Sequence, residues 1–316
     1  MGRNFRELLE AKWADGKFVC VGLDSEFGKI PKSAHRSGNE CAVSVANTMV
    51  KFNRAIVEAT KDIVLAYKPN AAFYEAHGDE GLAALHRTIA DIHAIAPDVP
   101  VILDAKRGDI GNTNNGYAEM AFDFLRADAI TVHPYLGGPD ALKPFLARED
   151  KGIIVLCRTS NPGAKEFQDM RVTVLGKDFD EIYQGQPADN EHFDMDKIMP
   201  LWKYVAHRVR GVWNRQNHNC AVVVGATYPD ELRQVRQIVD EMPILIPGIG
   251  AQGGDVEKTV KAGISKRGCG MIINSSRGII FASSGADYAE AARNETIKLQ
   301  LQIDSSLPTP HEVVNG

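Results

Sequence analysis

The chain of 316 residues is long for one β-sandwich and ordinary for one α/β barrel with insertions. Hydrophobic residues make up 44% and charged residues 24%, which is typical of a soluble domain with a large core. The net charge of −5 argues against a nucleic-acid-binding protein, because such proteins usually carry a basic surplus. A local basic pocket for a small anion is still compatible with this charge.

The cysteines and the N-terminus favour a cytoplasmic protein. The five cysteines are odd in number and form no CxxC pair, which is typical of reduced thiols and not of a disulfide framework or a zinc site. The N-terminal residues lack the apolar segment of a signal peptide. Apolar runs all fall short of the ~20 residues that a membrane span needs. The cysteines are Cys20, Cys41, Cys157, Cys220 and Cys269.

Short apolar runs alternate with helical patterns along the chain. Most of the runs are continuously apolar, which is typical of parallel strands covered on both faces. Segments 41–60 and 81–96 carry apolar residues at helical spacing. The pattern predicts an α/β fold, a (β/α)8 TIM barrel; a doubly wound open sheet, the competing fold, usually has fewer strands. The eight runs are 18–23, 63–67, 101–103, 129–132, 152–156, 221–224, 244–246 and 271–273.

One interval between strands is longer than the others. Residues from about 161 to 219 contain prolines, glycines and two acidic clusters, and we interpret them as an insertion after strand five that acts as a lid. A solvated surface excursion with no catalytic part is the alternative. We expect residues 1–316 to form a single barrel domain and the tail, 305–316, to be frayed.

Charged residues gather where the first three strands end. Asp24 follows the first run, Lys68 follows the second, and Asp104 and Lys106 follow the third, with Asp109 three residues later. In a strand, Asp104 and Lys106 would point to the same face. Catalytic groups of this fold lie at the carboxyl ends of the strands, so the cluster predicts an active site. A salt-bridge network that only joins strands is the alternative.

Glycine-rich loops after the last two strands predict a phosphate site. Residues 247–254 read Pro-Gly-Ile-Gly-Ala-Gln-Gly-Gly, and 274–278 read Asn-Ser-Ser-Arg-Gly, where Arg277 supplies a cationic fork. The first loop also matches GxGxxG, but it follows the seventh strand, and Lys266 and Arg267 stand where a ribose-binding acid would be needed. We therefore expect no dinucleotide site. Glycines that serve only a tight turn are the alternative.

Other polar residues give weaker signals. His133 after strand four could line the pocket, but a lone histidine is more often structural. Ser160 could contact a substrate or could stabilise a turn. Glu75 and His77 lack a third ligand at metal spacing, so we predict no metal site.

The segment from Asp104 to Thr113, Asp-Ala-Lys-Arg-Gly-Asp-Ile-Gly-Asn-Thr, closely resembles the D-x-K-x-x-D…T signature of the orotidine 5′-phosphate decarboxylase family. Blocks 21–24, 67–70, 159–163 and 247–252 are similar to further blocks of that family and follow in its order. The matching blocks run from about Val19 to Gly278. The longer loops resemble the longer bacterial branch of the family.

The resemblance implies a homodimeric enzyme without a cofactor that converts orotidine 5′-monophosphate to uridine 5′-monophosphate in de novo pyrimidine biosynthesis. Lys106 would protonate C6 of the pyrimidine, and Asp104 would face the substrate carboxylate. Asp109 and Thr113 would reach into the active site of the partner subunit.

The remaining positions carried over from the family are substrate contacts. Asp24 and Lys68 would hold the ribose hydroxyls, and Lys68 would complete the catalytic charge network. Contacts to the pyrimidine and to the phosphate side of the substrate would come from Ser160, Pro247, Gln252, Ser276 and Arg277, of which Gln252 and Arg277 would bind the phosphate itself. Ser276 departs from the shorter branch of the family, where a glycine is common.

Elementary chemistry agrees with these roles. Loss of CO2 from C6 leaves a carbanion with no conjugated electron sink, so the site must stabilise the charge electrostatically. A fixed ammonium beside C6 does this and can also donate the proton.

Two other functions stay open. A magnesium-dependent sugar-phosphate decarboxylase or aldolase of the same superfamily would share the D-x-K-x-x-D block, but it would carry an acid where this chain has Lys68, which would repel the metal. A non-catalytic barrel that only binds a phosphate ligand would not need the charges of Asp104, Lys106 and Asp109.

Overall fold

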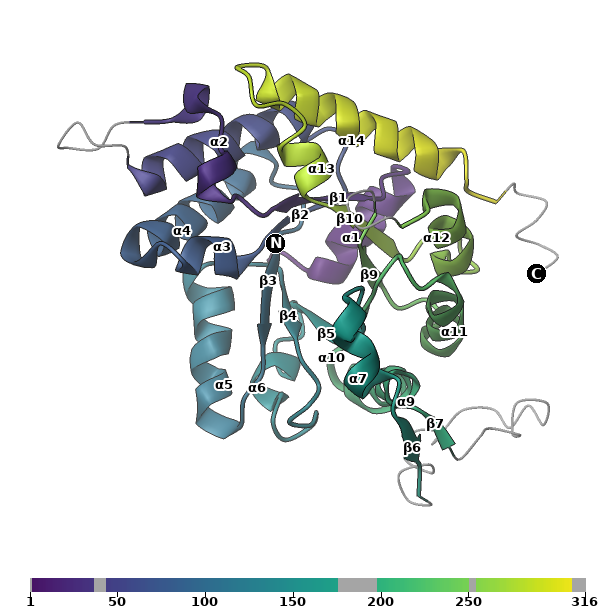
Figure 1. Ribbon diagram of the computed structural model, residues 1–316. Helices are drawn as coiled ribbons and strands as arrows, with labels where there is room; N and C mark the ends of the chain where they lie inside the picture. The colour runs from purple at the N-terminus through teal and green to yellow at the C-terminus, as the bar shows by residue number, and fades with distance from the viewer. Residues whose placement is uncertain (1, 37–43, 176–197, 250–253, 309–316) are drawn as a thin grey trace.

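The centre of the molecule is a barrel of eight parallel strands. The computed structural model describes residues 2–36, 44–175, 198–249 and 254–308, and within them the strands are β1 (Val19–Leu23), β2 (Ala66–Pro69), β3 (Ile102–Arg107), β4 (Ala129–Val132), β5 (Gly152–Arg158), β8 (Cys220–Val224), β9 (Ile244–Pro247) and β10 (Met271–Ser275). Their order is β2-β1-β10-β9-β8-β5-β4-β3. The two strands at the ends of this order, β2 and β3, are joined by parallel bridges from Tyr67 to Val101 and from Asn70 to Asp104, so the sheet closes into a barrel. The predicted TIM barrel is thereby confirmed (Figure 1).

Helices between the strands form the outer layer (Figure 1). The two helices predicted from apolar spacing are confirmed, and the longer of the two starts at Gly78. Met49, Phe52 and Ile56 form the buried face of the other. The helices are α2 (Val45–Thr60), α3 (Ala71–Glu75), α4 (Gly78–Ile95), α5 (Gly111–Ala118), η3 (Glu119–Phe124), α6 (Lys143–Leu146), α9 (Leu201–Arg208), η5 (Val209–Trp213), α10 (Asn214–Asn217), α11 (Pro229–Val239), α12 (Val256–Gly263), α13 (Arg277–Ile280) and α14 (Tyr288–Asp304), with 3-10 turns η1 (Phe27–Lys29) and η2 (Lys32–Ala34).

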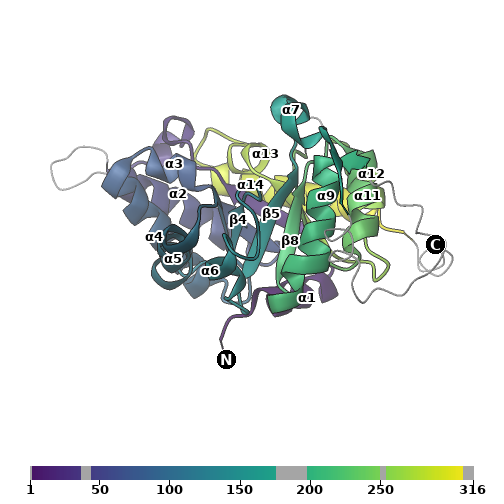
Figure 2. The same ribbon diagram turned by 90° about the horizontal axis from the view of Figure 1, so that it is seen from below.

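An N-terminal helix, α1 (Phe5–Ala14), closes the amino-terminal end of the barrel. Phe5 and Leu9 are buried, and the indole Nε1 of Trp13 donates a 2.9 Å hydrogen bond to the carbonyl of Met271 at the start of β10. In Figure 2 this helix lies at the opposite end of the molecule from α13 and from α7 (Lys165–Gln168). The carboxyl ends of the strands are therefore the end at which a site can open.

The long segment after β5 contains two kinds of structure. A 3-10 turn, η4 (Pro162–Ala164), and α7 lead into β6 (Arg171–Thr173), which pairs antiparallel with β7 (Ile198–Pro200). Residues 201–217 instead form the helical layer that follows β5 in the barrel. The expected insertion at 161–219 thus includes this regular helix, and its residues 176–197 lie outside the described part of the chain. A lid function for it stays a prediction.

The base of this insertion is joined to the barrel rim by Arg158. The side chain of Arg158 is fully buried at the end of β5, with Nε 3.0 Å from Asp169 Oδ1 and the guanidinium 3.8 Å from the ring centroid of Tyr228. The backbone N–H of Thr159 donates to Gln168 Oε1 at 2.9 Å. A buried cation is tolerated because it is paired, and this pairing holds the segment next to Ser160 in place.

The cysteines of the described chain are free thiols. Burial raises the pKa of Cys20, Cys157 and Cys220 to about 12, so these thiols are neutral at physiological pH. Cys269 is half-buried, and Cys41 lies outside the described residues. Within the described chain, none of the helices has the length and apolarity needed to cross a membrane.

The packing of α1 against the barrel can be tested at Gly152. A Cβ added to Gly152 would collide with the ring of Phe5 and lie 2.7 Å from the Cβ of Ala129. We expect Gly152→Ala to lower the free energy of unfolding by about 1–3 kcal/mol through overpacking, measured by urea denaturation. Gly28→Ala is the matched control, because its Cβ would meet nothing within 4 Å. Equal midpoints of urea denaturation for Gly152→Ala and Gly28→Ala would contradict the tight packing of α1.

Candidate active site

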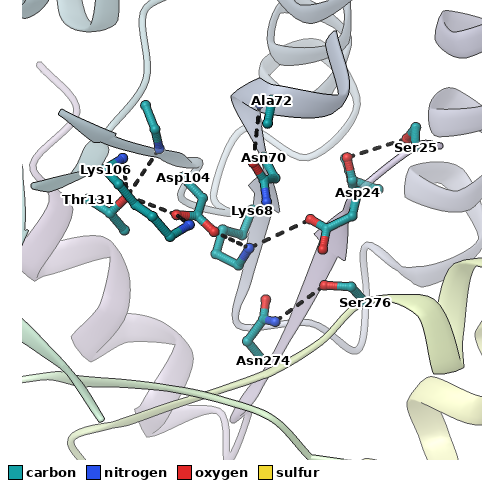
Figure 3. Close-up of polar contacts among 12 residues, drawn as sticks. Asp24, Ser25, Lys68, Asn70, Ala72, Asp104, Lys106, Thr131, Asn274 and Ser276 are labelled. Atoms are coloured by element: carbon teal, nitrogen blue, oxygen red, sulfur yellow. Dashed lines mark hydrogen bonds and ion pairs between the residues drawn. The ribbon is translucent and has the colours of Figure 1, made fainter. Parts of the chain in front are cut away.

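Four charged side chains meet at the carboxyl ends of β1, β2 and β3 (Figure 3). Lys68 Nζ lies 3.0 Å from Asp104 Oδ2 and 3.7 Å from Asp24 Oδ1. Lys106 Nζ lies 2.7 Å from Asp104 Oδ1. The structure therefore brings the sequence-predicted Asp24, Lys68, Asp104 and Lys106 into one network of alternating charge.

The two inner members of this network stabilise each other's ionised form. Burial lowers the pKa of Lys68, but the carboxylates of Asp104 and Asp24 outweigh it and raise that pKa above its ordinary value. Burial likewise raises the pKa of Asp104, but the ammonium groups of Lys68 and Lys106 hold it well below its usual range. Asp104 is thus an anion and Lys68 a cation throughout the neutral range.

Lys106 differs from both, because half of its side chain is exposed. An ammonium group can form three hydrogen bonds, and Asp104 is its one carboxylate partner in the described structure. The network therefore presents one accessible cation that is held in place by buried neighbours. Such an arrangement can stabilise negative charge that develops on a bound molecule.

Asp104 and Lys106 come together in a different way from the one predicted. Leu103 pairs with Ile130 on β4, but the next pair is Arg107 with Val132, so β3 contains two extra residues at this point. Lys106 has φ +49°, a left-handed conformation that is strained for a residue with a Cβ. A bulge of the strand, and not simple alternation along it, places the two side chains side by side.

Sequence reasoning missed Thr131, which lies beneath this bulge. Its hydroxyl donates to Asp104 Oδ1 at 2.9 Å. The available signal was a single polar residue in the otherwise apolar run from Ala129 to Val132.

Asp109 and Thr113 lie apart from the four-residue network. They stand before and within the first turn of α5, where Asp109 is half-buried and Thr113 is exposed. Asp109 Oδ1 accepts the backbone N–H of Ile110 at 2.7 Å. In the described ranges, no hydrogen bond or ion pair links either side chain to Asp104 or Lys106 of the same chain.

The loops predicted to bind phosphate are partly described. Pro247 ends β9, and Gln252 lies outside the described residues. Arg277 is exposed at the start of α13 and forms no ion pair with the described carboxylates. Strand β10 extends to Ser275, two residues beyond the predicted run.

Two polar side chains of this region lie over Gly22 of β1. A Cβ at Gly22 would collide with the hydroxyl of Ser276 and approach Asn274 Oδ1 to 3.3 Å, so only glycine leaves room for them. Asn274 Oδ1 and Asp24 Oδ1 are buried acceptors that receive no hydrogen bond from the described chain. They mark where hydroxyl or amide donors of a ligand can bind.

The weaker candidates occupy other places. Ser160 is half-buried on the rim between β5 and β8, where a Cβ at Gly225 would lie 2.7 Å from its Cα. His133 hydrogen-bonds to the carbonyl of Gly108 at 3.0 Å. Glu75 forms an ion pair with Arg107. No group of three or more histidine, cysteine, aspartate or glutamate side chains that could hold a metal is found where the chain is described.

The chain is similar to known proteins over most of its length. The sequence model of the "Orotidine 5'-phosphate decarboxylase / HUMPS family" matches residues 18–293. The orotidine 5'-phosphate decarboxylases of Ralstonia pickettii (strain 12J) and Cellvibrio japonicus (strain Ueda107) are each 43% identical to it, over 95% of this chain and 98% of theirs.

Solved structures agree with the sequence matches. The Leishmania donovani OMP decarboxylase has 36% identity and a TM-score of 0.72, over 94% of this chain and 99% of that one. The Leishmania donovani UMP synthase has 36% identity and a TM-score of 0.73; 95% of this chain matches it, and the chain spans 57% of its length.

Fold and site together define a TIM-barrel protein with a charged network at the carboxyl ends of its strands. The chain belongs to the orotidine 5'-phosphate decarboxylase / HUMPS family, as the motif of residues 104–113 predicted.

The pairing of Lys68 can be tested through stability. In the wild type, the depressed pKa of Asp104 stabilises the fold above the unfolded-state pKa of about 4, and this stabilisation is lost as the pH falls. Lys68→Met removes the buried partner, and we expect the free energy of unfolding at pH 7 to fall by about 3–5 kcal/mol.

The difference in the free energy of unfolding between wild type and Lys68→Met should become smaller as the pH is lowered from 7 toward 4, because Asp104 of the variant then takes up a proton. Urea denaturation at each pH measures it. Lys298→Met, which removes an exposed lysine paired with Glu295, is the control and should change little at any pH. If Lys68→Met loses little free energy of unfolding, or if the loss does not depend on pH, the result would argue against the pairing of Lys68 with Asp104.

Proposed function

We propose that this protein decarboxylates orotidine 5′-monophosphate to uridine 5′-monophosphate, a step of de novo pyrimidine biosynthesis, and does so without a cofactor. The observation that supports it most is the network in which Lys106, half-exposed, is held 2.7 Å from Asp104, whose side chain is 12% exposed. Family membership and the names of the relatives point to the same reaction.

Lys106 acts on the reacting carbon. When the bond between C6 and the carboxylate breaks, CO2 leaves and the electron pair stays on C6. The ammonium of Lys106 stabilises that pair and then gives it a proton, which forms the C6–H bond of the product. The neutral amine regains a proton from water, so atoms and charge balance. Asp104 faces the departing carboxylate and keeps Lys106 in position.

The remaining residues hold the substrate. Asp24 and Lys68 bind the ribose hydroxyls, a role supported by Asp24 Oδ1, which receives no hydrogen bond from the described chain. Arg277 binds the phosphate as a cation free of described carboxylate partners, and the family resemblance adds Gln252. The resemblance likewise assigns Ser160 to the pyrimidine and Pro247 and Ser276 to further substrate contacts. Phosphate binding far from C6 supplies energy that the reaction uses in its transition state.

The magnesium-dependent alternative fits the site less well. Lys68 Nζ lies between Asp24 and Asp104, where a divalent cation would need those carboxylates. A bound metal would have to displace a buried ammonium whose pKa the same carboxylates raise. This is the feature that favours the metal-independent reaction over the sugar-phosphate reactions.

The active form is a homodimer that shares its sites. Asp109 and Thr113 have no described contact with the network of their own chain, and Ile110, which follows Asp109, is an exposed apolar side chain. Exposed apolar surface of this kind is typical of a protein interface. The cytoplasmic location expected from the cysteines stays a prediction. Further exposed apolar side chains follow β3 and β4, at Phe124, Tyr135 and Leu136.

The reaction is tested with purified protein in excess EDTA, by the fall in ultraviolet absorbance of orotidine 5′-monophosphate. We expect full conversion in EDTA, and a loss of kcat of more than about a thousandfold in Lys106→Ala with the fold intact. Lys298→Ala is the control, because that lysine is exposed on α14. Conversion that stops with EDTA and returns with magnesium would support the sugar-phosphate alternative. Near-normal turnover by Lys106→Ala would remove Lys106 from the chemistry.

The shared site is tested by mixing two inactive variants, Lys106→Ala and Asp109→Ala. Subunit exchange forms heterodimers in which one of the two sites has both residues intact, so about a quarter of wild-type activity should return for random pairing. Each variant mixed with itself is the control. If Asp109 serves its own chain, the mixture stays inactive.

A further inference from the structure

Thr131 lies directly beneath the reactive network, on β4. Its side chain is 1% exposed, and the other residues of the strand, Ala129, Ile130 and Val132, are apolar. A hydroxyl in such a position must be hydrogen-bonded to be tolerated. Where its bonds go therefore shows what it does.

The hydroxyl of Thr131 uses its full hydrogen-bonding capacity on β3. Its oxygen accepts the backbone N–H of Ala105 at 3.0 Å and that of Lys106 at 2.9 Å. The same hydroxyl donates its proton to Asp104 Oδ1 at 2.9 Å. One donor and two acceptor sites are all that a hydroxyl has, so it is fully engaged with the three residues of the bulge (Figure 3).

The two accepted bonds replace a missing part of the sheet. Because β3 has two extra residues between its pairs with Ile130 and Val132, the amides within the bulge lose the regular ladder to β4. Thr131 provides the acceptor that both amides need. This is also the point where Lys106 takes φ +49°, and strained backbone of this kind persists only where its surroundings hold it.

The donated bond connects the backbone to the charges. Asp104 Oδ1 receives both the hydroxyl of Thr131 and the ammonium of Lys106, the latter at 2.7 Å. Lys106 is thus held at both ends: its backbone N–H by Thr131, and its Nζ by a carboxylate that Thr131 orients. The hydroxyl, Asp104 and Lys106 form one closed ring of contacts.

We propose that Thr131 is a positioning residue for the decarboxylation, which sets the location of the Lys106 ammonium and of the Asp104 carboxylate. The inference rests on the proposed function. Thr131 does not touch the substrate in this role; it acts through Asp104 and Lys106. A purely structural role, in which the hydroxyl only satisfies two amides of the barrel, is the alternative that the test must separate.

The test compares Thr131→Val with Thr131→Ser. Valine keeps the shape and burial but removes all three hydrogen bonds, whereas serine keeps the hydroxyl. For Thr131→Val we expect kcat for orotidine 5′-monophosphate to fall about tenfold to a hundredfold with KM within about threefold, because small misplacement of reacting groups has effects of this size. Thr131→Ser should restore kcat to within about threefold of wild type.

Two further measurements report on Lys106 itself. Exchange of the C6 proton of uridine 5′-monophosphate for solvent deuterium should slow in Thr131→Val in proportion to kcat, because both need the ammonium beside C6. In a crystal structure of the variant, Lys106 should leave its left-handed conformation and its Nζ should move away from Asp104 Oδ1. This second measurement needs no turnover.

Thr296→Val is the matched control. Thr296 is fully buried in α14, far along the chain from the network, and its hydroxyl donates to the carbonyl of Ala292 at 2.7 Å. Its variant removes a buried hydroxyl of the same kind, so it should lower the urea midpoint without changing kcat. If Thr296→Val and Thr131→Val lose kcat equally, or if serine fails to rescue, the role of Thr131 is only structural.

The remaining outcomes are also decisive. A kcat within about twofold of wild type in Thr131→Val would overturn the inference while leaving the proposed function intact. Wild-type protein that does not convert orotidine 5′-monophosphate would overturn the proposed function, and the position of Lys106 in the variant crystal would still decide the inference. Should Thr131→Val fail to fold, Thr131→Cys replaces it, and a wild-type kcat there would overturn the inference.

Discussion

The buried ammonium of Lys68 holds the reactive site together. A cation with 4% of its side chain exposed is stable only because Asp104 and Asp24 lie 3.0 and 3.7 Å away. Its two partners belong to different strands, so the pairing fixes the ends of β1, β2 and β3 relative to one another. A charge network of this kind needs a rigid frame, and the closed barrel provides it.

Strand pairing in the barrel shifts register at two places, in β5 against β8 and in β3 against β4, and the second of these carries the reactive residues. The amino-terminal end of the barrel is closed by the buried side chains of α1, which favours stability there. At the carboxyl end, β3 departs from its register with β4 and carries Lys106 in a strained conformation. The strain is local and is balanced by hydrogen bonds to Thr131. The energy of folding thus maintains a geometry that the strand alone would not adopt.

The site also divides its functions among distant parts of the chain. The charged network comes from the first three strands, and the cation proposed for the phosphate, Arg277, follows the last one. The proposed homodimer would add Asp109 and Thr113, which lie apart from the network of their own chain. The proposed reaction accordingly combines a fixed reactive centre with binding groups that surround a substrate.

Local patterns in the amino-acid sequence were enough to predict the class of fold and the members of the reactive cluster. Eight apolar runs with helical segments between them predicted the barrel, because strand and helix periodicities are local properties. The charges of Asp104, Lys106 and Asp109 near a strand end predicted an active site, since those residue types rarely gather there without a function. The resemblance of residues 104–113 to a known signature predicted the family.

The way in which these residues meet depends on pairing between strands. Strand alternation predicted that Asp104 and Lys106 share a face, but a bulge set by pairing with β4 brings them together. The role of Thr131 could not be predicted from the sequence, because Thr131 acts on the neighbouring strand. Its hydrogen-bond partner Lys106 is 25 residues away along the chain. The prediction placed residues 201–217 within the insertion. The prolines and glycines that precede this helical layer gave no signal for where the insertion ends and the barrel helix begins. Pairing between strands is a long-range property, and a local pattern does not contain it.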